Sequence, residues 1–276
     1  MAHPVVSGNK IRKLEYLLPV LKSGSSLGVV SFGGIYSNHI HALAWLCKVY
    51  EVPLHLMVRA HTGLRKGEFS PTLRDVSNWG AEVHFLSPTD YRCHTQDDHL
   101  EYWQSRFPGY AIVPEGGSHG SALKGIGSMV SEVYDDLSHP DVWICPVGTG
   151  ATLAGIVRHA QPDQLVLGIS ALKASNLDKN ILHRWDLTSY PNWTVAHQWH
   201  FGGYGHVRTE LIRFIHEFYQ TTDILLDPLY NGKAMYALDQ YISSRLITPQ
   251  SRVVFLHTGG LQGWRGLNKD SEIPVD

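Results

Sequence analysis

The sequence predicts an α/β protein that contains two parallel β-sheets. Short β-rich segments alternate with amphipathic helical segments along almost the whole chain, which is typical of parallel sheets covered by helices. Segments such as VWICPV and VVFLHT are apolar throughout, as expected of strands that are covered on both faces. The chain holds about eight such segments, which is many for one small open sheet, so we expect two α/β units.

The chain is expected to open with a turn and a helix. The stretch SGN at 7–9, which begins with Ser7, has turn and helix-capping chemistry, and apolar residues then recur at helical spacing from Ile11 to Leu21. A helix is therefore predicted from Lys10 onwards. A lysine in the first turn lies at the positive end of the helix dipole, which is mildly unfavourable. Lys10 is either an ordinary surface lysine or one whose amine the turn directs at a ligand.

The remaining elements follow from the same patterns. Apolar runs predict strands at residues 27–32, 53–58, 81–86, 110–114, 141–147, 164–170, 193–198 and 252–258. Amphipathic stretches between them predict helices at 38–50, 70–79, 95–106, 119–137, 151–160, 208–220 and 232–244. The stretch GGSHGSALKG leads into the long helix at 119–137, so the hinge between the two units is expected there.

Composition and charge exclude several classes of protein. The 276 residues are 43% hydrophobic and 17% charged, which is ordinary for a soluble globular protein. The 23 Lys and Arg residues balance 25 Asp and Glu residues without a basic stripe, so no nucleic-acid partner is expected. No apolar run approaches membrane-spanning length, and the widely spaced Cys47, Cys93 and Cys145 suit reduced cytoplasmic thiols. The 17 histidines form no metal-binding motif, so no metal is expected.

Glycine-rich stretches follow four of the predicted strands. They are SFGGIYSNH (31–39), PEGGSHG (114–120), PVGTGATLAG (146–155) and HTGGLQG (257–263). In open parallel sheets, ligands bind beyond the carboxyl ends of the strands. Four such loops at strand ends therefore predict a ligand site.

The PVGTGATLAG loop opens a helix, where backbone N–H groups can hold an anion. The groups concerned are those of Gly148, Thr149, Gly150, Ala151 and Thr152. A P-loop is excluded because no Gly-Lys-Ser/Thr follows. The next strand ends without the acidic residue that a dinucleotide's ribose needs, which leaves a single phosphate monoester or a plain tight turn.

Five side chains in the other glycine-rich loops are candidate site residues. Ser37 and Asn38 begin a helix, where they are either an ordinary cap or a ligand-facing hydroxyl and amide. Thr258 offers a neutral hydroxyl before two glycines. Tyr204 and Tyr230 either pack at an edge or present an aromatic face and a phenolic hydroxyl to a ligand.

Seven stretches, in their order along the chain, resemble the pyridoxal-phosphate enzymes of the tryptophan synthase β-like fold. They are SGNKIRKLEYL, GGIYSNH, PEGGS, VGTGATLAG, GGYG, LLDPLYNGKAM and HTGG. The matching branch contains D-cysteine desulfhydrase and 1-aminocyclopropane-1-carboxylate (ACC) deaminase, and the resemblance covers nearly the whole chain. It implies two parallel-sheet α/β domains with the cofactor cleft between them: a small one at 13–123, and a large one formed by 1–12 and 124–276. It also implies pyridoxal 5′-phosphate as cofactor and a homodimer.

The resemblance assigns cofactor-binding roles. Lys10 is the lysine that binds the cofactor covalently, and the 148–152 loop holds the phosphate. Asn38 corresponds to the residue that hydrogen-bonds the ring's 3-hydroxyl, and Thr258 to the hydroxyl facing the pyridine nitrogen. Lys13, one turn further on, is the alternative amine and is interpreted as a surface or packing residue.

The resemblance also assigns residues to the substrate. Ser37 corresponds to a residue that meets the substrate carboxylate or moves a proton, and Lys10 or Ser37 is the expected base. Tyr204 and Tyr230 correspond to two tyrosines near substrate and ring. A threonine at position 258 leaves the pyridine nitrogen largely neutral, which favours loss of a β-substituent. The expected reaction is conversion of D-cysteine to pyruvate, ammonia and sulfide.

Three alternatives stay open. In the resemblance, ACC-opening enzymes carry a Tyr-Glu pair where this chain has Tyr230 and Asn231, and they lack the threonine at position 258. Asn231 fits neither branch, so ACC deaminase is one alternative. Relatives usually carry a further segment before His3-Pro4, so a non-catalytic protein that binds pyridoxal phosphate or another phosphorylated small molecule is a second. A nucleotide-binding protein is a third, which the missing acidic residue disfavours.

Overall fold

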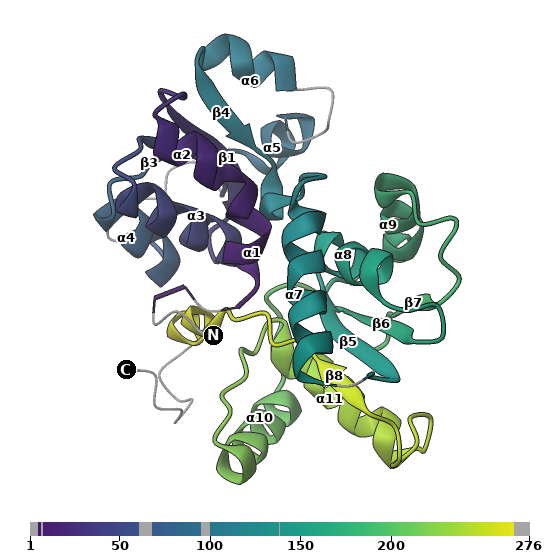
Figure 1. The fold of residues 1–276 in the computed structure, drawn as a ribbon. Coiled ribbons are helices and arrows are strands. Elements are labelled where there is room, and N and C mark those ends of the chain that lie inside the picture. Colours follow the sequence, from purple (N-terminus) through teal and green to yellow (C-terminus); the bar gives the residue numbers. More distant parts are fainter. Residues whose placement is uncertain (1–4, 7, 61–67, 95–99, 138, 268–276) are drawn as a thin grey trace.

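The computed structural model describes residues 5–6, 8–60, 68–94, 100–137 and 139–267, drawn in colour in Figure 1. Among these residues, eight strands form two four-stranded sheets with the orders β3-β2-β1-β4 and β7-β6-β5-β8. The first sheet contains β1 (Gly28–Gly34), β2 (Leu54–Arg59), β3 (Glu82–Leu86) and β4 (Tyr110–Val113). The second contains β5 (Val142–Val147), β6 (Leu165–Ser170), β7 (Trp193–Ala196) and β8 (Val253–Phe255).

Every pairing between neighbouring strands is parallel in the described part of both sheets. The eight predicted strands are all present within a few residues of their expected bounds. All six residues of β5 are buried, as its uninterrupted apolar sequence predicts for a strand covered on both faces. The predicted parallel α/β class is therefore confirmed.

Helices connect the strands. They are α1 (Lys10–Leu14), α2 (Leu18–Ser23), α3 (Asn38–Val49), α4 (Pro71–Asn78), α5 (Pro88–His94), α6 (Leu100–Arg106), α7 (Ala122–Asp136), α8 (Ala151–His159), α9 (Leu177–Trp185), α10 (Thr209–Thr222) and α11 (Asn231–Ser243), with short 3-10 helices η1 (Glu15–Leu17), η4 (Glu115–Gly117) and η5 (Leu261–Gly266). The sequence prediction missed α5 and α9. Residues 95–99 of the helix expected at 95–106 lie outside the described residues.

The opening helix differs from the prediction because it is broken into α1, η1 and α2. Pro19 occupies the first turn of α2 and has no N–H to continue the hydrogen-bond ladder of the preceding turn. Leu14 and Leu17 stay buried across this interruption.

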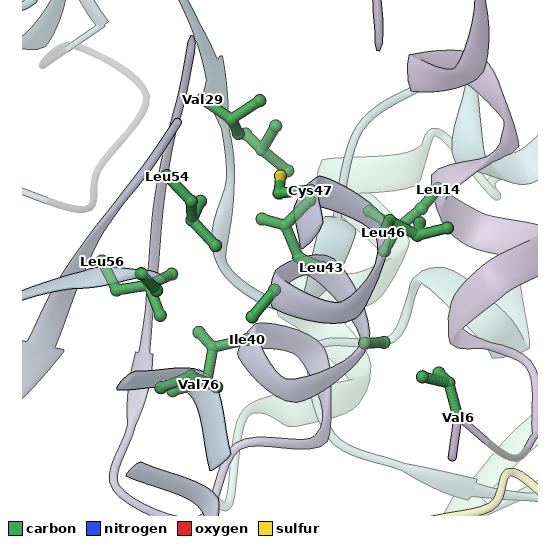
Figure 2. Close-up of a cluster of buried hydrophobic side chains, with 14 of the residues drawn as sticks. Val6, Leu14, Val29, Ile40, Leu43, Leu46, Cys47, Leu54, Leu56 and Val76 are labelled. Carbon is green, nitrogen blue, oxygen red and sulfur yellow. The ribbon is translucent and has the colours of Figure 1, made fainter. Parts of the chain in front are cut away.

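The first sheet packs one face against α3. Figure 2 shows Ile40 and Leu43 on α3 directed towards Leu54 and Leu56 on β2. Ile40, Leu43 and Leu56 are completely buried. Each such side chain contributes about 1.5–3 kcal/mol by leaving water. The same cluster includes Val6 from the start of the described chain, so the segment that precedes α1 is held against this unit.

The second sheet is covered by α8 on one side and by α11 on the other. Trp143 on β5 is the largest fully buried side chain of the described residues, and its Nε1 donates to Gln164 Oε1 at 2.9 Å. Its partner Gln164 is also buried, so this indole N–H is satisfied within the core.

Two segments, α1 and η5, join the two units. Helix α1 contacts both α3 of the first unit and α7 of the second. Near the C-terminal end, η5 lies against α4 (Figure 1), where Arg265 forms a two-point ion pair with Asp75. The boundaries expected at 12/13 and 123/124 stay a prediction. None of the helices in the described part of the chain has the length and apolar composition that crossing a membrane requires.

Candidate active site

A cavity of about 600 Å³ lies between the two units, at the carboxyl ends of strands from both sheets. Cavities of roughly 300–1,000 Å³ are typical of small-molecule sites. Ten of the eleven predicted site residues line it: Lys10, Ser37, Asn38, Gly148, Thr149, Gly150, Thr152, Tyr204, Tyr230 and Thr258. The eleventh, Ala151, has its side chain buried in the core beside them, and the prediction for it concerned its backbone N–H.

Asn9 holds the Lys10 amine at the cavity. The sequence predicted that Asn9 caps α1, but its side chain makes no capping hydrogen bond. Instead, Lys10 Nζ donates to Asn9 Oδ1 at 3.0 Å, and Asn9 Nδ2 donates to Thr152 Oγ1 at 2.7 Å. Burial lowers the pKa of Lys10 to about 8, although Asp227 raises it in part. Ser7, the first residue of the predicted turn, lies outside the described residues.

Gly8 allows this turn to approach the loop that carries Thr258. It has a left-handed φ of +81°, and a Cβ at this position would lie 2.1 Å from the carbonyl carbon of Thr258. No side chain fits there without displacement of backbone. The glycine therefore sets how closely the Lys10 segment packs on the end of β8.

Replacing Gly8 with Ala is expected to lower the free energy of unfolding by more than about 3 kcal/mol, because strain in φ adds to a clash with backbone. Gly24→Ala is the matched control, since Gly24 also has a positive φ, of +63°, but open space around its Cβ position. The control should lose only about 1–2 kcal/mol. Urea denaturation of both variants measures the difference, and equal losses would contradict the packing argument.

The loop before α8 has the features of an anion site. Gly150 takes a left-handed φ of +85° at the helix start, and a Cβ there would collide with Ile181. The first N–H groups of a helix have no partner within the helix, so they are free to bind an anion. The loop is fixed from two sides, since Ser118 Oγ donates to Thr149 Oγ1 at 2.7 Å and Asn9 donates to Thr152.

Asp227, which sequence reasoning missed, organises the start of α11. Its carboxylate is completely buried and accepts hydrogen bonds from the backbone N–H groups of Leu229, Tyr230 and Asn231 at 2.8–3.0 Å. Burial raises the pKa of Asp227, and these hydrogen bonds oppose the rise. An Asp just before a helix is a recognisable capping signal. This carboxylate holds the turn that directs Tyr230 into the cavity.

Asn231 connects that turn to Thr258. Its side-chain Nδ2 donates to the carbonyl of Gly259 at 2.7 Å, and its Oδ1 accepts from the backbone N–H of Thr258 at 2.8 Å and from the Thr258 hydroxyl at 3.3 Å. All these groups are buried. Thr258 therefore reaches the cavity in a position that Asp227 sets through Asn231.

The two predicted tyrosines lie beside each other, with ring centroids 6.0 Å apart. Burial raises the pKa of Tyr204 to about 12 and raises that of Tyr230 well above its usual value. Both phenols are therefore protonated at neutral pH. Lys233, another residue that the sequence did not single out, donates to the carbonyls of His200 and Gly203 and so anchors the loop that carries Tyr204.

On the first unit, α3 presents Asn38 and His39 to the cavity. Gln262 Nε2 donates to Asn38 Oδ1 at 2.7 Å, which leaves the Asn38 amide nitrogen as a donor. Ser31 Oγ donates to the carbonyl of Val113, so it must accept from His39 Nε2, 2.8 Å away. Burial lowers the pKa of His39 to about 3, and its Nδ1 has no hydrogen-bond partner among the described residues. A neutral imidazole with a bare acceptor therefore borders the cavity.

Ser37 precedes α3, but its hydroxyl does not cap the helix. It lines the cavity instead, which agrees with the second of its two predicted roles, that of a ligand-facing hydroxyl. Lys13 was predicted to be a surface or packing residue, and the surface alternative is wrong, because Lys13 is 2% exposed, lines the cavity and donates to the carbonyl of Gly116 at 2.5 Å. Burial and the charge of Lys10 lower the pKa of Lys13 well below its usual value.

Two charged side chains of the first unit also line the cavity and were not predicted. Glu115, directly after β4, is held by Tyr91 through a hydrogen bond, and burial raises its pKa. Arg59, at the end of β2, lies over the Tyr91 ring at 5.6 Å from its centroid. Both follow strands, as a search for polar residues at strand ends could have found.

Comparison with known proteins agrees with this geometry. A family described as "Pyridoxal-phosphate dependent enzyme" matches residues 2–259. A Thermotoga maritima protein provisionally named 1-aminocyclopropane-1-carboxylate deaminase is 29% identical, over 94% of this chain and 86% of its own. The Arabidopsis thaliana mitochondrial bifunctional D-cysteine desulfhydrase/1-aminocyclopropane-1-carboxylate deaminase is 27% identical, over 94% of this chain and 70% of its own.

The fold is also similar to solved structures. The crystal structure of an ACC deaminase homologue superposes with a TM-score of 0.74 at 26% identity, covering 93% of this chain and 81% of the other. The family resemblance and the fold class inferred from the glycine-rich motifs are thereby confirmed. The family match covers the lysine turn and the anion loop together with almost the whole chain. The protein belongs to the pyridoxal-phosphate dependent enzyme family.

Proposed function

We propose that this protein is a pyridoxal-phosphate-dependent lyase that converts D-cysteine and water to pyruvate, ammonia and hydrogen sulfide. The observation that carries the proposal is the link between a buried amine and an anion loop. Asn9 accepts from Lys10 Nζ at 3.0 Å and donates to Thr152 Oγ1 at 2.7 Å. A compact molecule that has both an aldehyde and a phosphate can reach both groups at once.

The cavity residues suit this cofactor. The free N–H groups before and within the first turn of α8 would hold the phosphate, and the Asn38 amide nitrogen would meet the ring hydroxyl. The Thr258 hydroxyl would face the ring nitrogen, and Lys10 Nζ would be the attachment point. When bound, the cofactor supplies an acceptor for the electron pair that the substrate's α-carbon releases on losing its proton.

Side chains of the protein would accept and donate the protons. Lys10 Nζ is the favoured base, because its lowered pKa of about 8 leaves a sizeable neutral fraction near neutral pH. Ser37 Oγ is the second candidate. Tyr204 and Tyr230 stay protonated, so they can donate hydrogen bonds to a substrate carboxylate or to a departing sulfur.

Thr258 supports elimination. Its hydroxyl is neutral and is held by Asn231, so it cannot keep a ring nitrogen protonated as a carboxylate could. A weaker electron acceptor favours prompt loss of a β-substituent over protonation elsewhere on the cofactor. Glu115 is the one carboxylate among the described cavity-lining residues, and it lies on the opposite unit from Thr258.

ACC deaminase activity is the second candidate. Both relatives named above carry that activity in their names, one of them together with D-cysteine desulfhydrase. Two protonated phenols beside a base would also suit a ring-opening reaction that needs a proton donor. This chain has Asn231 after Tyr230 where ACC-opening enzymes carry a Tyr-Glu pair, and this difference places ACC deaminase activity second.

The test is a side-by-side assay of the purified protein, saturated with pyridoxal phosphate, on D-cysteine, L-cysteine, D-serine and ACC. We expect sulfide and pyruvate from D-cysteine at the highest kcat/KM. Ammonia and 2-oxobutanoate from ACC at a higher kcat/KM would favour the second candidate. A protein that turns yellow with the cofactor but acts on none of these would support a non-catalytic binder.

We also propose that the protein is a homodimer of two-domain chains, as the resemblance implies, and that it acts in the cytoplasm. Sedimentation equilibrium measures the first, with twice the chain mass of 30.9 kDa expected. Limited proteolysis between residues 112 and 124 tests the predicted domain boundary.

A further inference from the structure

Two histidines and a glutamate form a cluster on the first sheet. His55 lies on β2, and Glu82 and His84 lie on the neighbouring strand β3, with Glu82 opposite His55 in the parallel register. Because alternate residues of a strand share a face, all three side chains lie on the face that Met57 and Leu86 share with α5 and α6. His55 and Glu82 are near the amino ends of their strands, whereas the cavity of the active site is at the carboxyl ends.

The donor atoms have the spacing of a metal site. His55 Nδ1 lies 3.0 Å from His84 Nε2 and 3.5 Å from a Glu82 oxygen, and His84 Nε2 lies 3.3 Å from the other oxygen. Ligand atoms about 2.0–2.1 Å from a tetrahedral zinc ion are about 3.3 Å from one another. All three separations are close to that value, and the two to Glu82 end on different oxygens of one carboxylate, so either oxygen is placed to become the third ligand.

Hydrogen bonds cannot pair the two ring nitrogens with each other and with Glu82 at the same time. If both ring nitrogens carry a proton for the Glu82 carboxylate, the two N–H groups face each other at 3.0 Å. If one nitrogen donates to the other, neither of these two nitrogens has a proton left for the Glu82 carboxylate, because each offers either one N–H or one lone pair. A cation between the three atoms removes the conflict, since each atom then offers a lone pair.

We propose that His55, Glu82 and His84 bind a divalent transition-metal ion, with Zn²⁺ as the fitting example, through two imidazole nitrogens and one carboxylate, leaving a fourth position open to water. Imidazole ligands select zinc, copper or nickel, whereas magnesium and calcium take oxygen ligands. The site would join the edge strand β3 to β2.

The surroundings favour binding without large rearrangement. The His55 ring, 18% exposed, packs against Phe107 and Tyr110 with centroid distances of 4.8 and 5.3 Å, which fixes its orientation. Glu82 is 65% exposed and can rotate to bring either oxygen to the ion. Glu82 is the most exposed of the three ligands, so solvent can reach the cluster.

The spacing of these ligands explains why the sequence did not reveal them. His55 and His84 are 29 residues apart, so no short motif contains both. Only the pairing of β2 with β3 brings the rings together.

Titration of the cofactor-loaded protein with Zn²⁺ after chelator treatment tests the proposal. We expect about one ion per chain in isothermal titration calorimetry, with affinity reduced about tenfold or more by Glu82→Gln and about 100-fold or more by His84→Gln. Co²⁺ should give visible d–d absorption bands that both substitutions remove. Glu82 is exposed, so E82Q keeps a folded test available if H84Q unfolds.

His197→Gln is the matched control, because His197 also pairs with one carboxylate, Asp178 at 3.8 Å, but belongs to no three-ligand cluster of the described residues. It should leave the affinity unchanged. Wild-type affinity no tighter than that of E82Q and H84Q, or equal loss in H197Q, would overturn the proposal. Failure of D-cysteine breakdown would not affect it, since metal binding is measured directly.

Discussion

Lys10→Ala is expected to lower the kcat/KM for D-cysteine by about 10³-fold or more, because it removes both the attachment point of the cofactor and the favoured base. The lysine amine is buried at the cavity and linked through Asn9 to the anion loop. The purified variant should also lose the covalently held fraction of the cofactor. Borohydride reduction followed by peptide mapping measures this directly, with the label expected on Lys10 in the unsubstituted protein.

The competing amine is Lys13, which lines the same cavity. A label on Lys13 instead of Lys10 would contradict the assignment. Lys22→Ala is the control for loss of a lysine charge, since Lys22 lies in the last turn of α2, exposed and outside the cavity-lining set. Its kcat/KM should stay within a factor of about two of the unsubstituted protein, as expected for a surface change.

Asp227→Ala is expected to lower the free energy of unfolding by about 3 kcal/mol or more. The substitution leaves three backbone N–H groups and the Asn231 amide without their acceptor in a site that water does not reach. Because Asn231 also holds Thr258, the loss should extend to the cavity and lower kcat/KM even where the variant is folded. Urea denaturation and activity at low urea measure the two effects.

Asp239→Ala provides the comparison, as Asp239 belongs to the same helix but is exposed. Its unfolding free energy should change by no more than about 0.5 kcal/mol. Equal stability of the Asp227 and Asp239 variants would mean that the start of α11 is held by other contacts. Asp227→Asn should fall between them, since an amide oxygen still accepts hydrogen bonds while its NH₂ group faces donors.

Much of the fold was predictable because it depends on local patterns. Each strand is a short apolar run, and its neighbours in sequence are amphipathic, so strand positions and the parallel class follow from composition within windows of a few residues. The break before Pro19 was visible in principle, since proline in an expected helix removes one hydrogen bond.

The site was predictable where glycine-rich loops follow strands. Parallel sheets bring their carboxyl ends together, so residues of four distant loops, among them Ser37, Thr149 and Thr258, were expected to meet and line one cavity. The Lys10 turn, by contrast, was identified only through resemblance to a family, because a single lysine after a turn carries no pattern of its own.

By itself, the sequence determined the parallel α/β class, the strand positions and the glycine-lined strand ends, because these depend on neighbours within a few residues. The tertiary structure decided which polar groups meet. Asn9 bonds to Thr152 instead of capping its helix, Lys13 is buried, and Asp227 positions Thr258 through Asn231. Hydrogen bonding between residues 143 positions apart, as in the pair Asn9 and Thr152, depends on how whole elements pack, which no local pattern encodes.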